Sequence, residues 1–268
     1  MKIAFPTDEH FPFQDDQARE VAMMIIQDFN PDLLVIGSDG LDFYDISTFD
    51  KDPKRVKVDI QKEIDMWKGG VREWTDAAPR ARKRYIPGNH EDRLRRYLWR
   101  HPEIAALEAL RLDKLLDFEA LGIEWDEREY DNAEIVLFDQ LAIRHGRYIR
   151  QSAGMSARAE LEADRYSISC MTGHTHRGGT VHATTREGLV TAQECFCLCR
   201  LDPVYLARPN WQQGIVLADV DDHHLTIEAI PIHTFQRGSS PAKAVSSAGN
   251  FDGRTSKVSH WRGEEYRA

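Results

Sequence analysis

Three short apolar runs in the first third of the chain each end in a loop of glycine and polar residues. They are Lys2–Pro6, Leu33–Ile36 and Arg84–Pro87. A helical pattern over Gln17–Phe29 joins the first two runs. Strand, helix and strand in this order predict parallel pairing, because the connection has to cross back over the sheet. We therefore expect an α/β fold in which the loops after these strands lie at one sheet edge.

A second helix is expected between the second and third strands. From Ile60 to Trp74, apolar residues recur every three or four positions, as they do on the buried face of a helix. Pro53 stands where such a helix would begin, since proline is favoured in the first turn. Residues 91–121 are expected to form two or three helical pieces, broken near Pro102 and ending at Gly122.

From about Glu134 the pattern changes to β. A hairpin over 135–143 is expected to precede a helix over 152–163 and a strand over 167–171. Two sheets packed face to face, with helices outside, is the architecture that these elements favour. Further strands, which suggest the second sheet, lie near 180–185, 189–199 and 215–232.

One domain is expected over residues 1–235 of the 268-residue chain. Residues 236–268 are polar and lack periodicity, so this tail is expected to be flexible or draped over the surface. The formal net charge is −9, from 44 acidic and 35 basic residues. This balance argues against a broad nucleic-acid-binding surface, although bound divalent cations can reverse the potential of one face.

Hydropathy and cysteine usage favour a cytoplasmic protein without membrane contact. No apolar run approaches the roughly 20 residues that a membrane-spanning helix needs, and the first residues lack a signal-peptide core. The four cysteines fit a reducing compartment. Cys195, Cys197 and Cys199 alternate along an expected strand, which would place them on one face. With no fourth ligand nearby in sequence, small buried side chains are a better interpretation than a zinc site.

Residues that can bind metal ions follow most of the expected strands. Because the carboxyl ends of neighbouring parallel strands meet at one edge, these residues can share one crevice. Carboxylates, imidazoles and an amide without a thiolate suit Mn²⁺, Fe or Zn²⁺ better than a structural zinc. The alternatives are a solvated loop for the histidines near 175 and a buried structural role for His145. The full set is Asp8, His10, Asp39, Asp42, Asn89, His90, His145, His174 and His176.

These residues fall into five blocks that resemble the calcineurin-like metallophosphoesterases. The blocks of that family read D-x-H, G-D-x-x-D, G-N-H-D/E, H and G-H-x-H. Ser38 is a departure, because it stands between Gly37 and the acid, which are usually adjacent in the family. The resemblance spans residues 8 to 176. The matching segments here are Asp8-Glu9-His10, Gly37-Ser38-Asp39-Gly40-Leu41-Asp42, Gly88-Asn89-His90-Glu91, His145-Gly146 and Gly173-His174-Thr175-His176.

The resemblance implies a four-layer α/β/β/α sandwich of two mixed sheets and a site for two divalent metal ions. Asp39 would bridge the two ions. Mn²⁺ is the expected metal, with Fe, Zn²⁺, Ni²⁺ and Mg²⁺ as alternatives. The implied ligands are Asp8, His10 and His176 for one ion, and Asn89, His145 and His174 for the other.

The resemblance also implies a reaction, the hydrolysis of a phosphoester by a hydroxide that bridges the metals and attacks phosphorus in line. His90 would stabilise the transition state or protonate the leaving oxygen, and Asp42 would pair with His90 and keep it protonated. The segments GLDFYDIS, GNHEDRLRRYL and HGRY look like those of compact phage and prophage enzymes. That likeness favours a nucleic-acid or nucleotide phosphodiester as substrate. A phosphomonoesterase or protein phosphatase of the same fold is the alternative, and a binding module without activity is a further one.

Several side chains near these blocks are candidates for contacting the substrate. Arg147 and Arg177 are expected to clamp a phosphate, because guanidinium groups bind phosphate oxygens in pairs. Arg93 is expected to support the turn at Asn89, and the basic run that it begins is either a solvated helix face or a phosphate contact. Tyr44 and Tyr148 are candidates for the pocket wall. A monomer and a homodimer are both compatible with the sequence.

Overall fold

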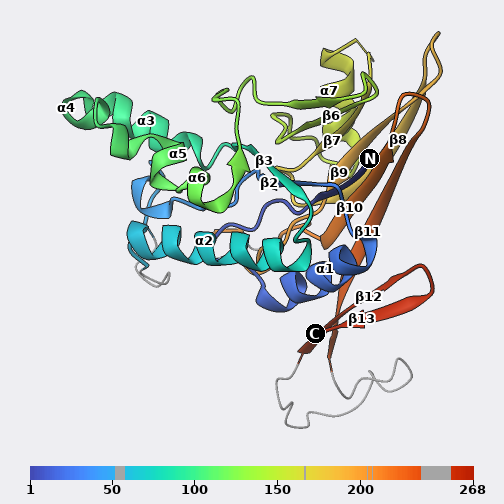
Figure 1. Cartoon of the computed structure of the whole chain (residues 1–268), viewed down its shortest axis with the longest axis horizontal. Coiled ribbons are helices and arrows are strands. Elements are labelled where there is room, and N and C mark those ends of the chain that lie inside the picture. The colour runs from blue at the N-terminus through green and yellow to red at the C-terminus, as the bar shows by residue number, and fades with distance from the viewer. Residues whose placement is uncertain (52–57, 166, 204, 207, 237–254) are drawn as a thin grey trace.

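The computed structural model describes residues 1–51, 58–165, 167–203, 205–206, 208–236 and 255–268. Two sheets form the centre of the molecule (Figure 1). The first sheet has the strand order β13-β12-β11-β10-β1-β2-β3-β4. Strands β1 to β4 are parallel to one another, and β10 to β13 add in antiparallel fashion beside β1. Their bounds are β1 (Lys2–Phe5), β2 (Leu33–Gly37), β3 (Arg82–Ile86), β4 (Ile123–Glu124), β10 (Gln213–Val220), β11 (Leu225–Gln236), β12 (Thr255–Trp261) and β13 (Glu264–Arg267).

The second sheet has the order β5-β6-β7-β9-β8. Strand β6 is antiparallel to β5 and parallel to β7, so this sheet is mixed as well. The expected hairpin is confirmed as β5 and β6. The strands are β5 (Ile135–Leu137), β6 (Leu141–Arg144), β7 (Ser169–Thr172), β8 (Gly178–Thr184) and β9 (Leu189–Cys195).

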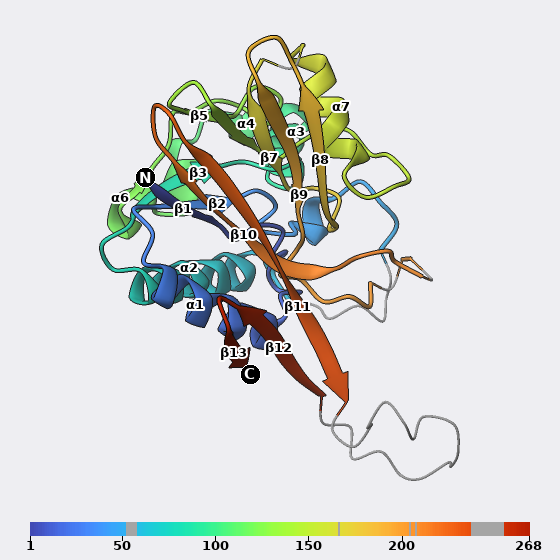
Figure 2. The ribbon, with the colours of Figure 1, turned by 90° about the vertical axis from the view of Figure 1, so that its right-hand side faces the viewer.

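Three helices cover the outer faces of the sheets. Helices α1 (Asp16–Phe29) and α2 (Ile60–Ala77) lie on the first sheet, and α7 (Met155–Ala163) lies on the second (Figure 2). The region between β3 and β4 is helical, broken near Pro102 and ending at Gly122 as expected, but it forms five short helices and not two or three. They are α3 (Asp92–Arg100), α4 (Pro102–Ala105), η2 (Glu108–Leu110), α5 (Leu112–Leu115) and α6 (Phe118–Leu121), and η1 (Tyr44–Ile46) follows β2.

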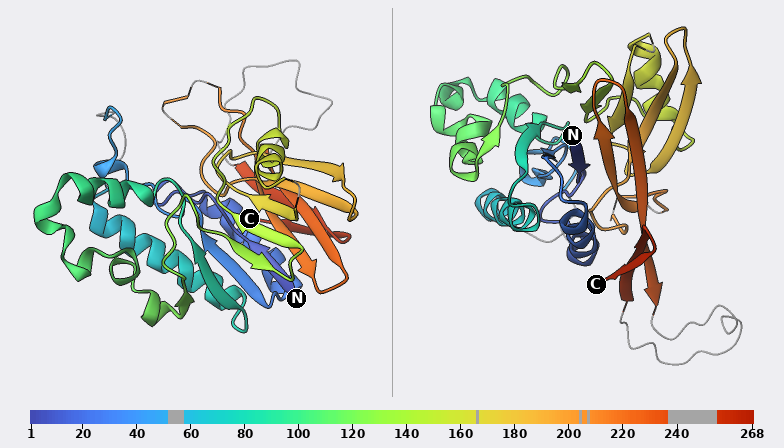
Figure 3. Two further views of the ribbon diagram at one scale, coloured as in Figure 1. Left: turned by 90° about the horizontal axis from the view of Figure 1, so that it is seen from above. Right: turned by 45° about the vertical axis from the view of Figure 1, so that its right-hand side comes forward.

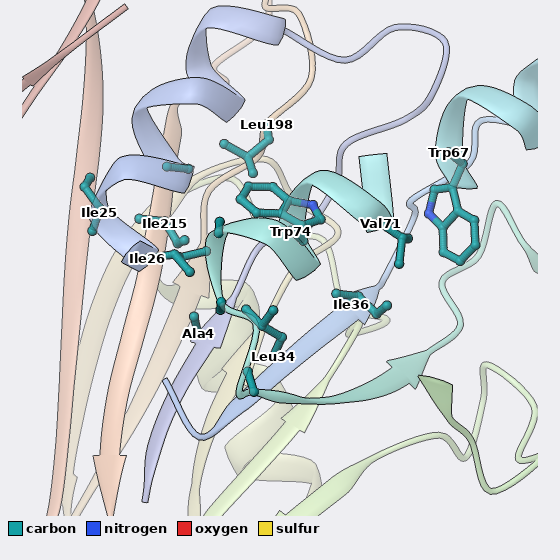
Figure 4. Packing of buried hydrophobic residues seen from close by; sticks show 14 of the residues in the cluster. Ala4, Ile25, Ile26, Leu34, Ile36, Trp67, Val71, Trp74, Leu198 and Ile215 are labelled. Carbon is teal, nitrogen blue, oxygen red and sulfur yellow. The ribbon is translucent and has the colours of Figure 1, made fainter. Parts of the chain in front are cut away.

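Alternating side chains along the strands divide the core into three layers. On the first sheet, Ala4, Leu34 and Ile36 point toward α1 and α2, where Trp74 and Ile25 meet them (Figure 4). Their neighbours along the strands, such as Ile3 and Val35, face the second sheet instead. A third cluster lies between the second sheet and α7. This order of layers confirms the four-layer α/β/β/α sandwich, since each face of each strand has its own apolar cover.

Aspartate side chains mark where both long helices begin. The carboxylate of Asp15 accepts a hydrogen bond from the backbone N–H of Ala18 at the start of α1, and Asp59 accepts one from Lys62 at the start of α2. Such caps satisfy backbone donors that have no partner within the helix. The second helix therefore begins at Ile60, and Pro53 lies outside the described residues.

Two expectations about the later strands are wrong. Strands β10 and β11 do not belong to the second sheet, because β10 pairs with β1 of the first, with Ile3 opposite Ala218. Residues 255–267, expected as flexible or draped, form the hairpin β12–β13 at the edge of the first sheet (Figure 3). The buried ammonium of Lys257 fastens this hairpin, lying 3.0 Å from Asp15 and 2.5 Å from Gln213 Oε1. Residues 237–254 of the expected tail lie outside the described residues.

Within the described part of the chain, no helix combines the length and the apolar character needed to cross a membrane.

Candidate metal centre

The loops after β1 and β2 run side by side at the carboxyl edge of the first sheet. The backbone N–H of Asp8 donates to Ser38 O at 3.0 Å, and that of His10 donates to Asp39 O at 3.0 Å. A third bond joins Phe11 N to Gly40 O at 2.8 Å. These bonds fix the position of the two loops, so the acids that they carry face one crevice.

The first cluster of donor atoms forms around Nε2 of His176. This nitrogen lies 2.9 Å from Nε2 of His10 and 3.2 Å from Oδ1 of Asp8. Oδ2 of Asp39 is 3.9 Å from Nε2 of His10. Two imidazole nitrogens and two carboxylates thus converge on one point, the donor set that a divalent transition metal prefers.

The second cluster forms around Nε2 of His145. Its neighbours are Oδ1 of Asn89 at 2.9 Å, Nδ1 of His174 at 3.1 Å and Oδ2 of Asp39 at 3.3 Å. Asp39 Oδ2 therefore lies beside both clusters. A carboxylate in this position can hold two cations about 4 Å apart. The structure brings all seven expected ligands together and divides them between two clusters as the resemblance implies.

Several of these residues hold the backbone in the left-handed region. Side chains other than glycine are strained there, at a cost of about 1 kcal/mol or more each, and such strain persists only where the surroundings hold the chain in place. Left-handed residues gather at functional sites for that reason. The positive φ values here are 54° for Asp8, 51° for His10, 53° for Ser38, 62° for Asp39, 73° for His174 and 57° for His176.

Two glycines allow the loops to approach one another. A Cβ at Gly88 would lie 2.1 Å from Oδ1 of Asp39, and one at Gly173 would lie 2.4 Å from Oδ2 of Asp8. Any side chain at either position would displace a candidate ligand. Steric crowding thus explains why glycine precedes both Asn89 and His174. The sequence blocks alone do not reveal this reason.

Ser38 lies behind the second cluster. Its Oγ is 2.8 Å from Nδ1 of His145 and 2.8 Å from Oγ1 of Thr7. Oγ1 of Thr7 is in turn 2.7 Å from Oδ2 of Asp8. These buried groups form a continuous chain of hydrogen bonds from His145 to Asp8, on the side of both residues that faces away from the donor clusters.

Burial and neighbouring charges set the protonation of the donors. Burial alone would raise the pKa of the Asp8 carboxyl, but hydrogen bonds from His10 and His176 hold that pKa well below its usual range. Burial lowers the pKa of His174 to about 4, so its ring is neutral at pH 7. Burial opposes the charged form of His10 as well, yet Asp42 and Asp8 raise its pKa to about 10.

His90 lies beside the clusters and pairs with Asp42, whose Oδ2 is 3.7 Å from Nδ1 of His90. Burial lowers the pKa of His90 to about 3, although the charge of Asp42 acts in the opposite direction. Nδ1 of His90 lies 3.0 Å from the backbone oxygen of Asp42, and Nε2 lies 2.9 Å from a guanidinium nitrogen of Arg93. Arg93 can only donate, so Nε2 accepts and the proton is on Nδ1. The Asp42 carboxylate contacts Nδ1 of His10 at 3.6 Å and Arg93 at 3.3 Å.

Glu91 supports the turn of the G-N-H-E block. Its buried carboxylate accepts backbone hydrogen bonds from Gly88 at 2.6 Å, Asp39 at 3.1 Å and Leu41 at 3.0 Å. Burial raises the pKa of Glu91 to about 7. One side chain thus joins the loop after β3 to the loop after β2, which places Asn89 next to Asp39.

A cavity of about 320 Å³ opens onto both clusters. Arg177 belongs to the cavity wall, but its side chain is buried, with Glu194 at 3.5 Å and a hydrogen bond to Gln151 O at 2.9 Å. Four lining residues were not anticipated: Ile149, Tyr205, Asn210 and Trp211. The aromatic residues in the polar loop after β9 are the sequence feature that could have indicated these lining residues. The expected site residues that line the cavity are Asp39, Asn89, His90, His174, His176 and Arg177.

The other proposed substrate contacts lie outside the lining of this cavity. Arg93 is engaged with Asp42 and His90, and Arg147 is exposed beside a separate polar cavity. The hydroxyl of Tyr44 points to Asp50 O at 3.5 Å. The backbone N–H of Tyr148 donates to Glu160.

All four cysteines are free and buried, as was expected of Cys195, Cys197 and Cys199. The expected placement of Cys195, Cys197 and Cys199 on one face of a strand is wrong. Strand β9 ends at Cys195 and the chain turns at Phe196, where φ is 64°, so Cys197 and Cys199 lie beyond the strand. Cys199 Sγ lies 3.8 Å from Nδ1 of His176, the ring nitrogen opposite the one in the first cluster.

The two sheets and their helices form a four-layer α/β/β/α sandwich, with a buried cluster of histidines and aspartates at the carboxyl edge of the first sheet. This is the architecture, and the position of the candidate metal site, that the resemblance of the sequence blocks to the calcineurin-like metallophosphoesterases implies.

The Gene 54 proteins of Mycobacterium phages L5 and D29 are relatives of this chain, each 26% identical to it. The matches run over 245 and 247 residues and cover 86% of this chain and 93% of each relative. Both are phage proteins, in line with the expected likeness to phage enzymes. Two structures of Vps29 from Entamoeba histolytica, a single mutant and the wild type complexed with Zn²⁺, match with a TM-score of 0.43 and 11% identity. They cover 86% of this chain and 92% of theirs. No family model matches the chain.

Proposed function

We propose that this protein is a phosphoester hydrolase that uses two divalent metal ions, with a nucleotide or nucleic-acid phosphodiester as its substrate. The observation that carries the proposal is the position of Asp39 Oδ2, within 3.9 Å of His10 and 3.3 Å of His145. One carboxylate shared by two nitrogen-rich clusters is the arrangement that a pair of cations requires. Mn²⁺ fits the mixed oxygen and nitrogen donors, and Fe, Zn²⁺, Ni²⁺ and Mg²⁺ remain alternatives.

Bound ions would supply Lewis acidity and an activated water at neutral pH. The residues of the chain determine where a substrate can lie. Asn89 contributes a neutral oxygen, which leaves the centre more positive toward a phosphate anion than a carboxylate would. His90 lines the cavity next to Asn89, so a phosphate at the clusters would lie within reach of its ring. An anion there favours the protonated form of His90, which can then give a proton to the leaving oxygen.

Two features support the choice of class. The set of candidate ligands is complete, whereas a binding module without activity has no need of two adjoining clusters. Six residues of the site have a left-handed backbone, a strained conformation that is common at functional sites. The free, buried thiols are compatible with a reducing cytoplasm.

The test is a hydrolysis screen of the purified chain with Mn²⁺ and with EDTA. Substrates are bis-p-nitrophenyl phosphate, p-nitrophenyl phosphate, and single- and double-stranded DNA. We expect Mn²⁺-dependent cleavage of diesters, about two ions per chain by elemental analysis, and loss of both in Asp39→Ala. Asp222→Ala, at an exposed position between β10 and β11, is the matched control. Cleavage of the monoester alone would favour a phosphomonoesterase. Wild-type protein that binds no metal would refute the proposal.

A further inference from the structure

One side of the cavity at the metal centre is apolar. Trp211, Tyr205 and Ile149 line it together with Asp39, Asn89 and three histidines. Ile149 is 69% exposed and Tyr205 is 66% exposed. These three side chains, called the apolar wall below, come from two loops, one after β6 and one after β9. Large apolar side chains exposed beside a polar centre indicate a binding surface more than a core.

The apolar wall is held in a fixed position relative to the candidate ligands. The ring of Trp211 lies edge-on to the ring of His176, with centroids 4.2 Å apart, and Tyr205 lies 6.2 Å from Trp211. The neighbouring residue, Gln212, donates its backbone N–H to His176 O at 2.8 Å and accepts from Cys197 N at 3.1 Å. A group that rests on Trp211 therefore lies next to the first donor cluster.

The apolar wall beside the metal centre favours a ligand that has both an anionic group and an apolar group. The metal centre attracts an anion, while the apolar wall offers aromatic surface and no charge. A phosphate ester of a sugar would use only the first feature. A nucleotide uses both, because its phosphate and its flat base lie at opposite ends of one small molecule and bases stack on aromatic side chains without need of a specific sequence.

We propose that the apolar wall binds the base of a nucleotide whose phosphate lies at the two donor clusters, and that Trp211 is its main stacking surface. This inference rests on the proposed function, since the phosphate position depends on bound metals. It makes the apolar wall a determinant of specificity: nucleotides are bound in preference to phosphates that lack a base.

The test compares AMP with ribose 5-phosphate, which has a hydroxyl group where AMP has its base. Their binding to the Mn²⁺-loaded protein is measured by titration calorimetry for wild type, Trp211→Ala, Trp211→Phe and Tyr205→Ala. Trp99→Ala is the matched control, because Trp99 is 67% exposed on α3 and lies outside this cavity. Metal content is measured for every variant.

We expect AMP to bind wild type about tenfold more tightly than ribose 5-phosphate, the size of effect that one stacked base gives. In Trp211→Ala the two probes should bind alike, with ribose 5-phosphate affinity and metal content unchanged. Trp211→Phe should keep most of the preference, Tyr205→Ala should reduce it, and Trp99→Ala should keep all of it.

Equal binding of the two probes to wild type would overturn the proposal. So would a Trp211→Ala variant that loses metal or binds both probes more weakly to the same degree, because Trp211 would then only support His176. The proposed function fails by a different result, the absence of any Mn²⁺-dependent hydrolysis. The two failures are therefore distinguishable.

Discussion

Ser38 Oγ lies 2.8 Å from Nδ1 of His145, at the one position where the chain departs from the family blocks. When Nδ1 donates to Ser38, the lone pair of His145 is on Nε2, which faces Asn89 and Asp39. Hydrogen bonds of this kind orient metal-binding histidines and fix their tautomer. Ser38 has a φ of 53°, a conformation that glycine adopts without strain. The serine thus accepts backbone strain at a place where its hydroxyl contacts a candidate ligand.

Replacing Ser38 should separate metal binding from stability. Ser38→Gly removes the hydroxyl and also the strain, which is worth about 1 kcal/mol. We expect the melting temperature in EDTA to stay the same or rise, while Mn²⁺ affinity falls by about 10- to 100-fold. Ser38→Ala loses the same hydrogen bond but keeps the strain, so its affinity should fall equally and its melting temperature should drop. Wild-type Mn²⁺ affinity in both variants would show that Ser38 does not orient His145.

Substitution of two adjacent residues, Asn89 and His90, should separate metal content from turnover. Asn89 Oδ1 lies in the second cluster, whereas both ring nitrogens of His90 contact Asp42 and Arg93. We expect Asn89→Ala to lose one of two bound ions. His90→Ala should keep both ions and lose about 10²- to 10⁴-fold in turnover, the usual contribution of a proton donor. Elemental analysis and the rate of diester cleavage measure the two effects. Loss of metal from His90→Ala would assign His90 to the ligands instead.

The arrangement of the site is predictable because it depends on local patterns. Each of the strands β1, β2 and β3 is a short apolar run, and each is followed by a loop with polar residues. Parallel pairing then places all of these loops at one edge, whatever the details of the turns. Asp8 and Asp39 meet for this reason, although thirty other residues separate them. The contacts of His90 were less predictable, since they depend on side-chain rotamers and on burial.

The later strands were harder to place because their partners are distant in sequence. Strand β10 pairs with β1 across more than 200 residues, and no local pattern specifies that choice. The β12–β13 hairpin was missed for a different reason. Its strands bury polar side chains such as Lys257 and Ser259, which bond to Gln213 and to Pro231 O. Hydropathy cannot distinguish a buried polar group that has partners from one that is exposed to water.

Close packing at Gly88 should make it far less tolerant of alanine than a glycine in a helix. The added Cβ would meet the side chain and the backbone nitrogen of Asp39, at 2.1 and 2.4 Å. We expect Gly88→Ala to lose Mn²⁺ binding and to unfold at a lower temperature. The matched control is Gly69→Ala within α2, where a Cβ meets nothing within 4 Å. That change should stabilise the protein by about 1 kcal/mol, because alanine favours the helix. Equal behaviour of the two variants in thermal unfolding would contradict the packing of Gly88 on Asp39.

Glu63 should make the protein less stable as the pH rises. Burial raises the pKa of this side chain to about 8, and the charges of Asp42 and Asp45 add to the effect. Its Oε1 accepts the backbone N–H of Phe43 at 2.6 Å. The folded chain keeps the proton up to about pH 8, whereas the unfolded chain loses it near the ordinary value of 4.5. Between these values unfolding releases a proton, so the free energy of unfolding falls as pH increases.

Glu63→Gln should remove this dependence, because glutamine cannot ionise and its carbonyl can still accept the bond from Phe43. In denaturant titrations with EDTA present, wild type and variant should be equally stable near pH 4.5. The variant should then gain up to about 1.4 kcal/mol for each pH unit as the pH rises to 8. Glu20→Gln, an exposed position on α1, is the matched control and should follow wild type throughout. If the curves of wild type and Glu63→Gln stay parallel from pH 4.5 to 8, Glu63 is ionised in the folded protein and this account of its burial is wrong.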